Sequence, residues 1–98
     1  PLVPESTTPE NARRAGDFNR WVAGEYLPKY EEESGHSNFV VFDLFNVLDD
    51  ESGYLKPSFR RSRQGDSHPN PEANRVAARA FTEFFRPVWE KWQARAQT

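Results

Sequence analysis

The sequence predicts an α/β protein in which a helix, a strand and a second helix follow one another. Apolar residues recur at spacings of three and four near both ends of the 98-residue chain, which is the period of a helix with one buried face. Between them lies one continuous apolar run, which is typical of a strand covered on both faces. We therefore predict helices over about 9–27 and 71–95 and a strand over about 38–45.

The single strand needs a partner outside itself. Its run Phe39–Phe45 holds Phe, Val and Leu and is interrupted by Asp43. A lone strand leaves its backbone N–H and C=O groups without hydrogen bonds. We therefore predict that the strand pairs with another copy, so that the protein is a homo-oligomer of at least two chains. Val3, in its extended segment, is a weaker partner within the chain.

Local signals set the ends of the first helix. Thr8 is a good N-cap, and Pro9 suits the first helical position. Pro28 is expected to kink or end the helix, because a proline ring clashes with the preceding turn. The sequence also allows one further helical turn, over Lys29–Glu33, before Ser34 and Gly35 end the helix. The apolar face consists of Ala15, Phe18, Trp21, Val22 and Tyr26.

The last helix begins with an equally clear signal. Asn70 is the predicted N-cap, Pro71 the first helical residue, and Glu72 adds negative charge to the first turn. Pro87 is expected to kink or interrupt the helix. Its wide aromatic stripe predicts core packing, with any surplus forming an interface. The stripe consists of Val76, Ala77, Ala80, Phe81, Phe84, Phe85, Val88, Trp89 and Trp92.

Composition bounds the protein to one small domain over residues 1–98 and excludes several chemistries. The chain has no cysteine, so it has no disulfide, thiolate metal site or cysteine nucleophile. Residues 1–55 carry 4 basic and 11 acidic side chains, whereas residues 56–98 carry 9 and 4. This split favours either antiparallel association or the packing of one half of the chain on the other. No apolar run approaches the roughly 20 residues that a membrane span needs, and no signal peptide is visible, so we expect a soluble protein. No cofactor, metal or nucleic acid is expected, and Arg60, Arg61 and Arg63 are interpreted as a solvated patch.

The long polar loop over residues 49–70 is the candidate for function, because loops of this length are uncommon inside compact domains. Asp49, Asp50 and Glu51 make an acidic turn that we interpret as solvated rather than as a calcium loop. Further along, an acid and a hydroxyl precede His68 directly, ahead of the rigid start of the last helix. An imidazole so placed suits proton transfer. The alternative is that this polar loop only leads into the last helix and has no chemical role.

Several separated pieces of the chain together resemble the C-terminal third of bacterial SGNH (GDSL-type) serine esterases. The resemblance implies a parallel sheet between helices, of which this chain would be a truncated helix–strand–helix unit. It also implies that His68 is the general base and that Asp66 orients it. The family's acid usually lies three residues before the histidine, where Gly65 stands here. The matching pieces are Pro1–Leu2, Asn11–Arg14, Phe18–Val22, Phe39–Leu48 and Asp66–Asn70.

The family's serine block and its oxyanion residues would belong upstream of this chain. Gly65-Asp66-Ser67 spells the family's nucleophile motif, but it does not follow an apolar strand, so we interpret the match as chance. Ser67 nevertheless remains a candidate nucleophile, most plausibly toward an imidazole of a second subunit. The other candidate hydroxyls are Ser37, Ser58 and Ser62.

These observations predict a small, promiscuous ester hydrolase of the esterase or lipase kind. His68 would be the base, Asp66 its orienter and Ser67 the candidate nucleophile, acting on a small ester or acyl substrate. The acyl cleft would be lined by Trp89, Phe85 and Phe45. Two alternatives remain: a catalytically silent fragment that self-associates, and a subunit that needs a separate chain carrying the serine.

Overall fold

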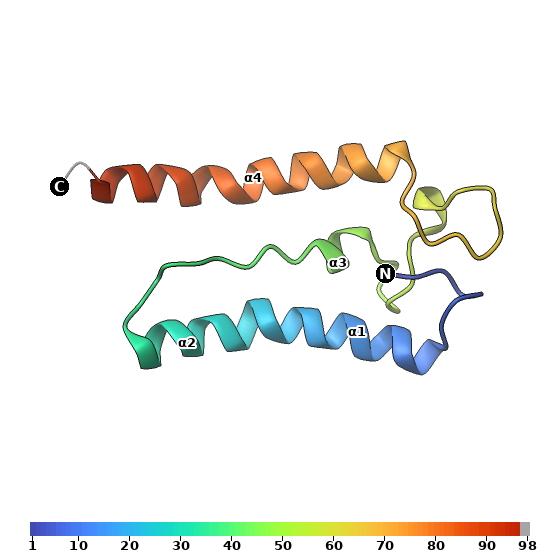
Figure 1. The fold of residues 1–98 in the computed structure, drawn as a ribbon, viewed down its shortest axis with the longest axis horizontal. Helices are drawn as coiled ribbons and strands as arrows, with labels where there is room; N and C mark the ends of the chain where they lie inside the picture. Colours follow the sequence, from blue (N-terminus) through green and yellow to red (C-terminus); the bar gives the residue numbers. More distant parts are fainter. Residues whose placement is uncertain (97–98) are drawn as a thin grey trace.

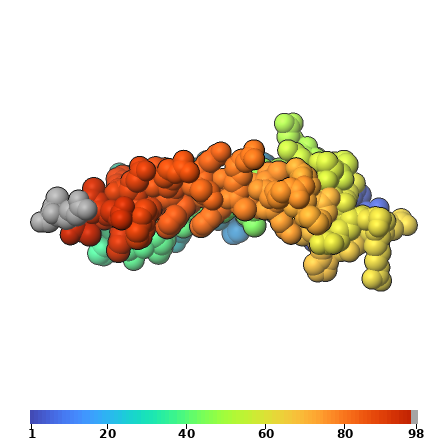
Figure 2. Space-filling view, turned by 90° about the horizontal axis from the view of Figure 1, so that it is seen from above, coloured from blue at the N-terminus to red at the C-terminus, as the bar shows by residue number. Residues whose placement is uncertain are grey.

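The computed structural model describes residues 1–96 as two helical rods with an extended segment between them (Figure 1). The first rod consists of α1 (Pro9–Trp21), the π-helix η1 (Val22–Tyr26) and α2 (Leu27–Ser34), and the second is α4 (Pro71–Ala96). The two rods run in the same direction and the extended segment runs back between them. The molecule measures 53 × 28 × 15 Å, and seen from above it is narrow, with α4 along its length (Figure 2).

The first rod confirms the predicted helix and extends it. Thr8 Oγ1 accepts a hydrogen bond from the backbone N–H of Asn11 at 3.2 Å, as expected of the N-cap. Pro28 does not end the rod. Its missing N–H leaves the α-helical ladder one bond short, and the wider η1 turn precedes it, with Leu27 N–H donating to Val22 C=O. The rod ends at Gly35, whose φ of 71° is left-handed.

The predicted strand over 38–45 is wrong, and so is the α/β fold class. The segment after Gly35 is extended but belongs to no sheet, and the described chain is mostly helical. Within residues 1–96, β-pairing is limited to two isolated bridges, Leu2 with Tyr54 and Asp49 with Leu55. The apolar run then enters α3 (Leu44–Leu48), because the carboxylate of Asp43 accepts the Asn46 backbone N–H at 3.1 Å and caps a helix there. No second strand lies beside the segment within residues 1–96.

The last helix is confirmed from end to end, but the expected interruption at Pro87 is not. Asn70 Oδ1 accepts the Ala73 backbone N–H at 2.9 Å, and α4 continues unbroken through Pro87. Because Pro87 has no N–H, the carbonyl of Glu83 lacks its helical hydrogen bond, and Glu83 is exposed. Water can therefore solvate that carbonyl, which lowers the cost of the missing bond.

The core lies at one end of the molecule, around the start of α4. The predicted polar loop over 49–70 supplies two of its members, Leu55 and Phe59, the latter on the 3₁₀ helix η2 (Pro57–Phe59). Gly53 lets this loop approach α1: a Cβ built there would lie 1.9 Å from the carbonyl oxygen of Ala12. The buried cluster is Val3, Leu48, Leu55, Phe59 and Ala73.

The opposite end is open. Along both rods, large aromatic side chains stay more than a third exposed. Those of α4 form a ladder of rings, with Phe81–Phe85, Phe85–Trp89 and Trp89–Trp92 centroids 5.6, 6.3 and 5.5 Å apart. The exposed aromatic residues of the first rod are Phe18, Trp21 and Tyr26.

Candidate active site

The loop that carries Asp66, Ser67 and His68 is anchored on both sides. Toward the N-terminal segment, Ser67 Oγ accepts the Val3 backbone N–H and Ser6 Oγ donates to the Gly65 carbonyl, each at 3.0 Å. Toward α4, Asn70 N–H donates to the carbonyl of Phe59 at 3.0 Å. The stretch is therefore a tethered turn, although its surface is solvated.

Asn70 connects the start of α4 to the loop. Besides capping α4, its Nδ2 donates to the carbonyls of Ser58 at 2.9 Å and Arg60 at 3.2 Å. The sequence identified the cap, which is local, but not the two carbonyls, which are brought close by the turn of η2. One side chain thus fixes the position of the helix start relative to the loop.

Asp66 and His68 form a hydrogen-bonded pair. One carboxylate oxygen, Oδ1, accepts both the backbone N–H of His68 at 3.0 Å and its imidazole Nδ1 at 2.7 Å. The Asp66 side chain is 21% exposed and the imidazole 88%. The backbone N–H of His68, followed by its ring, lowers the pKa of the Asp66 carboxyl below its ordinary value.

This arrangement sets the tautomer of the ring. An ionised carboxylate only accepts hydrogen bonds, so Nδ1 of His68 must carry the hydrogen. In the neutral imidazole the other nitrogen, Nε2, then holds the lone pair. No residue of the described chain bonds Nε2, so it faces solvent as a proton acceptor.

Ser67 holds the N-terminal segment against the loop. Its Oγ tethers Val3, and within residues 1–96 it makes no hydrogen bond to an imidazole. The side chains of neighbouring residues in extended backbone point apart, which keeps Ser67 and His68 from meeting. Ser37 accepts from Arg95 Nη1 at 2.9 Å, in the stretch that follows the first rod, and neither Ser58 nor Ser62 bonds His68.

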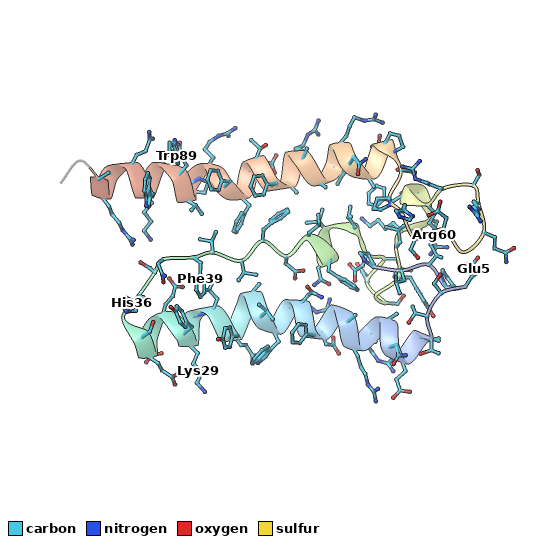
Figure 3. All side chains as sticks on the ribbon, viewed as in Figure 1. Glu5, Lys29, His36, Phe39, Arg60 and Trp89 are labelled. Carbon is cyan, nitrogen blue, oxygen red and sulfur yellow. The ribbon has the colours of Figure 1, made fainter. Side chains whose placement is uncertain are left out.

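The three predicted acyl-binding residues do not gather around His68. Phe85 and Trp89 line a groove of about 850 Å³ between α4 and the segment after Gly35. At 1.5 Å per helical residue they lie roughly 21 and 27 Å along α4 from Pro71. Figure 3 shows Trp89 and Phe39 at the opposite end of the molecule from Arg60, which belongs to the same loop as Asp66 and His68. Phe45 packs on α1, where a Cβ at Gly16 would meet its ring at 3.4 Å.

The acidic turn has a structural role. Asp50 Oδ1 accepts from Ser52 N, Ser52 Oγ and Tyr54 N at 3.0, 2.6 and 3.2 Å. Burial favours the protonated Asp50, but these hydrogen bonds outweigh it and lower the pKa of the carboxyl. Asp49 is only 6% exposed, and burial raises its pKa. Within the described residues, no group of three or more His, Cys, Asp or Glu side chains could hold a metal ion.

The arginines of the loop brace its backbone. Arg60 Nε donates to the carbonyl of Leu55 at 2.7 Å, and Arg61 Nη2 donates to that of Pro69 at 3.0 Å. The second bond reaches the residue that follows His68. These cations therefore contribute to the shape of the candidate site.

Comparisons of the chain with models of protein families, with curated proteins and with solved structures find no match. The resemblance to SGNH esterases thus rests on the sequence motifs and stays a prediction. Among the helices of residues 1–96, none is both long enough and apolar enough to cross a bilayer.

Proposed function

We propose that this protein hydrolyses carboxylic esters, with His68 as the general base and Asp66 as the residue that orients it. The observation that carries the proposal is the double contact of Asp66 Oδ1 with the backbone and ring of His68. It fixes the tautomer and leaves Nε2 as the base, which is the arrangement a base–acid pair needs.

The reaction can be written from these groups. Nε2 of His68 takes a proton from a water molecule while the water oxygen attacks the ester carbonyl carbon. The tetrahedral intermediate then collapses, the bond from carbon to the alkoxy oxygen breaks, and Nε2–H returns the proton to the leaving alcohol. The negative Asp66 stabilises the imidazolium between the two steps.

Water is the nucleophile that the geometry supports, because no hydroxyl of the described chain bonds the imidazole. The same free Nε2 would suit a serine contributed by a separate polypeptide, which is the alternative of an incomplete subunit. In both cases the pair of residues and their roles are the same.

The structure also bounds the substrate and the rate. Two of the first-turn amides of α4 are occupied, since Ala73 N–H bonds Asn70 Oδ1 and Asn74 N–H bonds the Asn70 carbonyl, which leaves Glu72 N–H as the single first-turn donor for an oxyanion. Pro71 has no N–H. The exposed ring is not enclosed by an acyl pocket. We therefore expect slow, promiscuous turnover of small activated esters.

The test is hydrolysis of nitrophenyl acetate and butyrate by the purified chain. We expect His68→Gln to lower the rate by at least about tenfold, which is less than the roughly 10²–10⁴-fold that a well-positioned base contributes, because the site does not enclose the substrate. Asp66→Asn should lower it too, because an amide no longer stabilises the imidazolium. His36→Gln is the matched control, since it removes the other histidine, which is exposed, and should leave the rate unchanged.

Two outcomes would contradict the proposal. One is an equal rate for the unchanged chain and His68→Gln, which would favour the silent fragment. The other is a loss of rate in His36→Gln as large as in His68→Gln, because general catalysis by any exposed histidine would then explain the activity.

A second function, self-association, is favoured by the exposed aromatic rings. Phe81, Trp89 and Trp92 are 46%, 45% and 59% exposed on α4, and Phe18 is 61% exposed on α1. The α4 half of the chain is basic and the α1 half acidic. We propose that α4 of one copy packs on the first rod of another, in which six acidic side chains outnumber four basic ones, so that opposite net charges lie beside each other.

A further inference from the structure

The extended segment Phe39–Phe42 alternates its side chains as a strand does. Phe39 stacks on Tyr30 of α2, with ring centroids 4.7 Å apart. Phe42 packs on the other rod, 5.4 Å from Phe81 and 5.2 Å from Phe84 between centroids. Val40 lines the groove together with Phe39, Phe85 and Trp89. Successive side chains thus point to opposite rods.

The backbone of the same segment has no partner. No residue among 1–96 makes a hydrogen bond to the N–H or C=O groups of Phe39, Val40 or Val41. In an extended chain these groups lie perpendicular to the side chains, and here the side chains occupy the plane of the two rods. The N–H and C=O groups therefore point along the shortest axis of the molecule.

Along that axis nothing in the described chain covers the segment. The molecule is 15 Å thick, little more than the roughly 10–12 Å diameter of one helix with its side chains. Figure 1 looks down this axis and shows that no other part of the ribbon crosses the segment between the rods. A row of unpaired N–H and C=O groups is a template for strand pairing.

We propose that Phe39–Val41 is a docking edge for an extended, apolar segment of another polypeptide, which adds to it as a β-strand. Only a second extended backbone offers acceptors and donors at the matching two-residue spacing. Its side chains would fall on the aromatic rings of both rods and fill the groove of about 850 Å³, which selects apolar residues.

Charge selects against a second copy at this edge. The segment lies in the acidic half of the chain, and Glu31, Glu32 and Glu33 of α2 lie just before it. Two copies paired here would bring these carboxylates together, whereas a neutral or basic strand would not. This binding is separate from the ester chemistry, because the edge and His68 lie near opposite ends of the molecule.

The probe is a capped, fluorescent peptide of alternating valine and threonine between terminal lysines. We expect it to bind saturably and to slow deuterium exchange at the amides of Phe39, Val40 and Val41. Its twin carries N-methyl groups on the residues of one edge and keeps the same side chains. The twin should bind at least about tenfold more weakly, because it loses the backbone hydrogen bonds.

A pair of variants tests the same edge from the other side. Val41→Pro removes one N–H while accepting an extended backbone, and it should weaken peptide binding by roughly tenfold. Val41→Thr keeps the N–H and the branched side chain and should bind as the unchanged chain does. Helix content measured by circular dichroism shows that each variant is folded.

Three results would overturn the proposal. Equal binding of the peptide and its N-methylated twin would show that only apolar contact is involved. Absence of binding by both peptides would remove the docking edge. Protection of the three amides by self-association, without peptide, would assign the edge to a second copy.

Discussion

Asp66 contacts His68 at two points, the backbone and the ring, through a single carboxylate oxygen. Because the two residues are only two positions apart, this pair could be predicted from the loop sequence and from the resemblance to SGNH esterases. The role of Ser67 could not, because its partner Val3 is 64 positions away. Local contacts are visible in a sequence, whereas a contact across the chain depends on the whole fold.

At the residue scale, Asp49 and Asp50 predict opposite effects of pH on stability. Burial raises the pKa of Asp49 above 3.8, so its ionisation opposes folding as the pH rises through the folded-state value. Asp49→Asn should therefore gain stability relative to the unchanged chain between acidic and neutral pH. The measurement is urea unfolding at several pH values.

Asp50→Asn is the matched control for that experiment. Its hydrogen bonds lower the folded-state pKa below 3.8, so Asp50 contributes stability above the unfolded-state pKa and loses it as the pH falls through the folded-state value. Asp50→Asn should lose relative stability as the pH rises. A parallel pH dependence in the two variants would contradict both assignments.

At the element scale, the helices were predicted correctly because their signals are local. Thr8 and Asn70 cap the helices they were expected to cap, and the apolar period continues between the caps. The strand was wrong because a sheet needs a second strand, which residues 1–96 do not provide. Asp43, noted as an interruption, turned out to begin α3. Leu55 and Phe59 were missed because single apolar residues in a polar loop carry no period.

Asn70 gives a prediction at this scale. Asn70→Ala loses the cap on α4 and both bonds to the Ser58 and Arg60 carbonyls, and we expect it to lower the free energy of unfolding by about 2 kcal/mol. Asn70→Asp keeps the capping oxygen and should lose less. Urea unfolding measures the free energy of unfolding of both variants. A loss below about 0.5 kcal/mol for Asn70→Ala would show that the three hydrogen bonds of the Asn70 side chain contribute little.

At the scale of the whole molecule, the chain is too extended to bury its apolar residues. Its radius of gyration is 16.2 Å, against about 13 Å for a compact chain of this length. The aromatic content was visible in the sequence. The predicted dimer rested on an unpaired strand and on a surplus apolar helix face. The exposure of the aromatic residues was therefore foreseeable in part, whereas the separation of the two rods was not.

The exposed rings predict a dimer at micromolar concentration, which sedimentation would show as twice the chain mass of 11.4 kDa. Trp89→Glu should shift the chain toward the monomer, because it removes an aromatic contact and adds a negative charge that the net-acidic first rod of the other copy repels. Lys91→Gln, an exposed control on the same helix, should have a smaller effect. A monomer for the unchanged chain would contradict the self-association.

The central claim, that His68 is a base held by Asp66, is tested most directly by the pH dependence of nitrophenyl acetate hydrolysis in the His36→Gln chain. There His68 is the only histidine, so its titration can be followed by NMR in the same sample. We predict that the rate rises over the pH range in which the His68 imidazole loses its proton, and that His68→Gln abolishes this rise. A rate that does not follow the titration of His68, or that survives its replacement, would contradict the account.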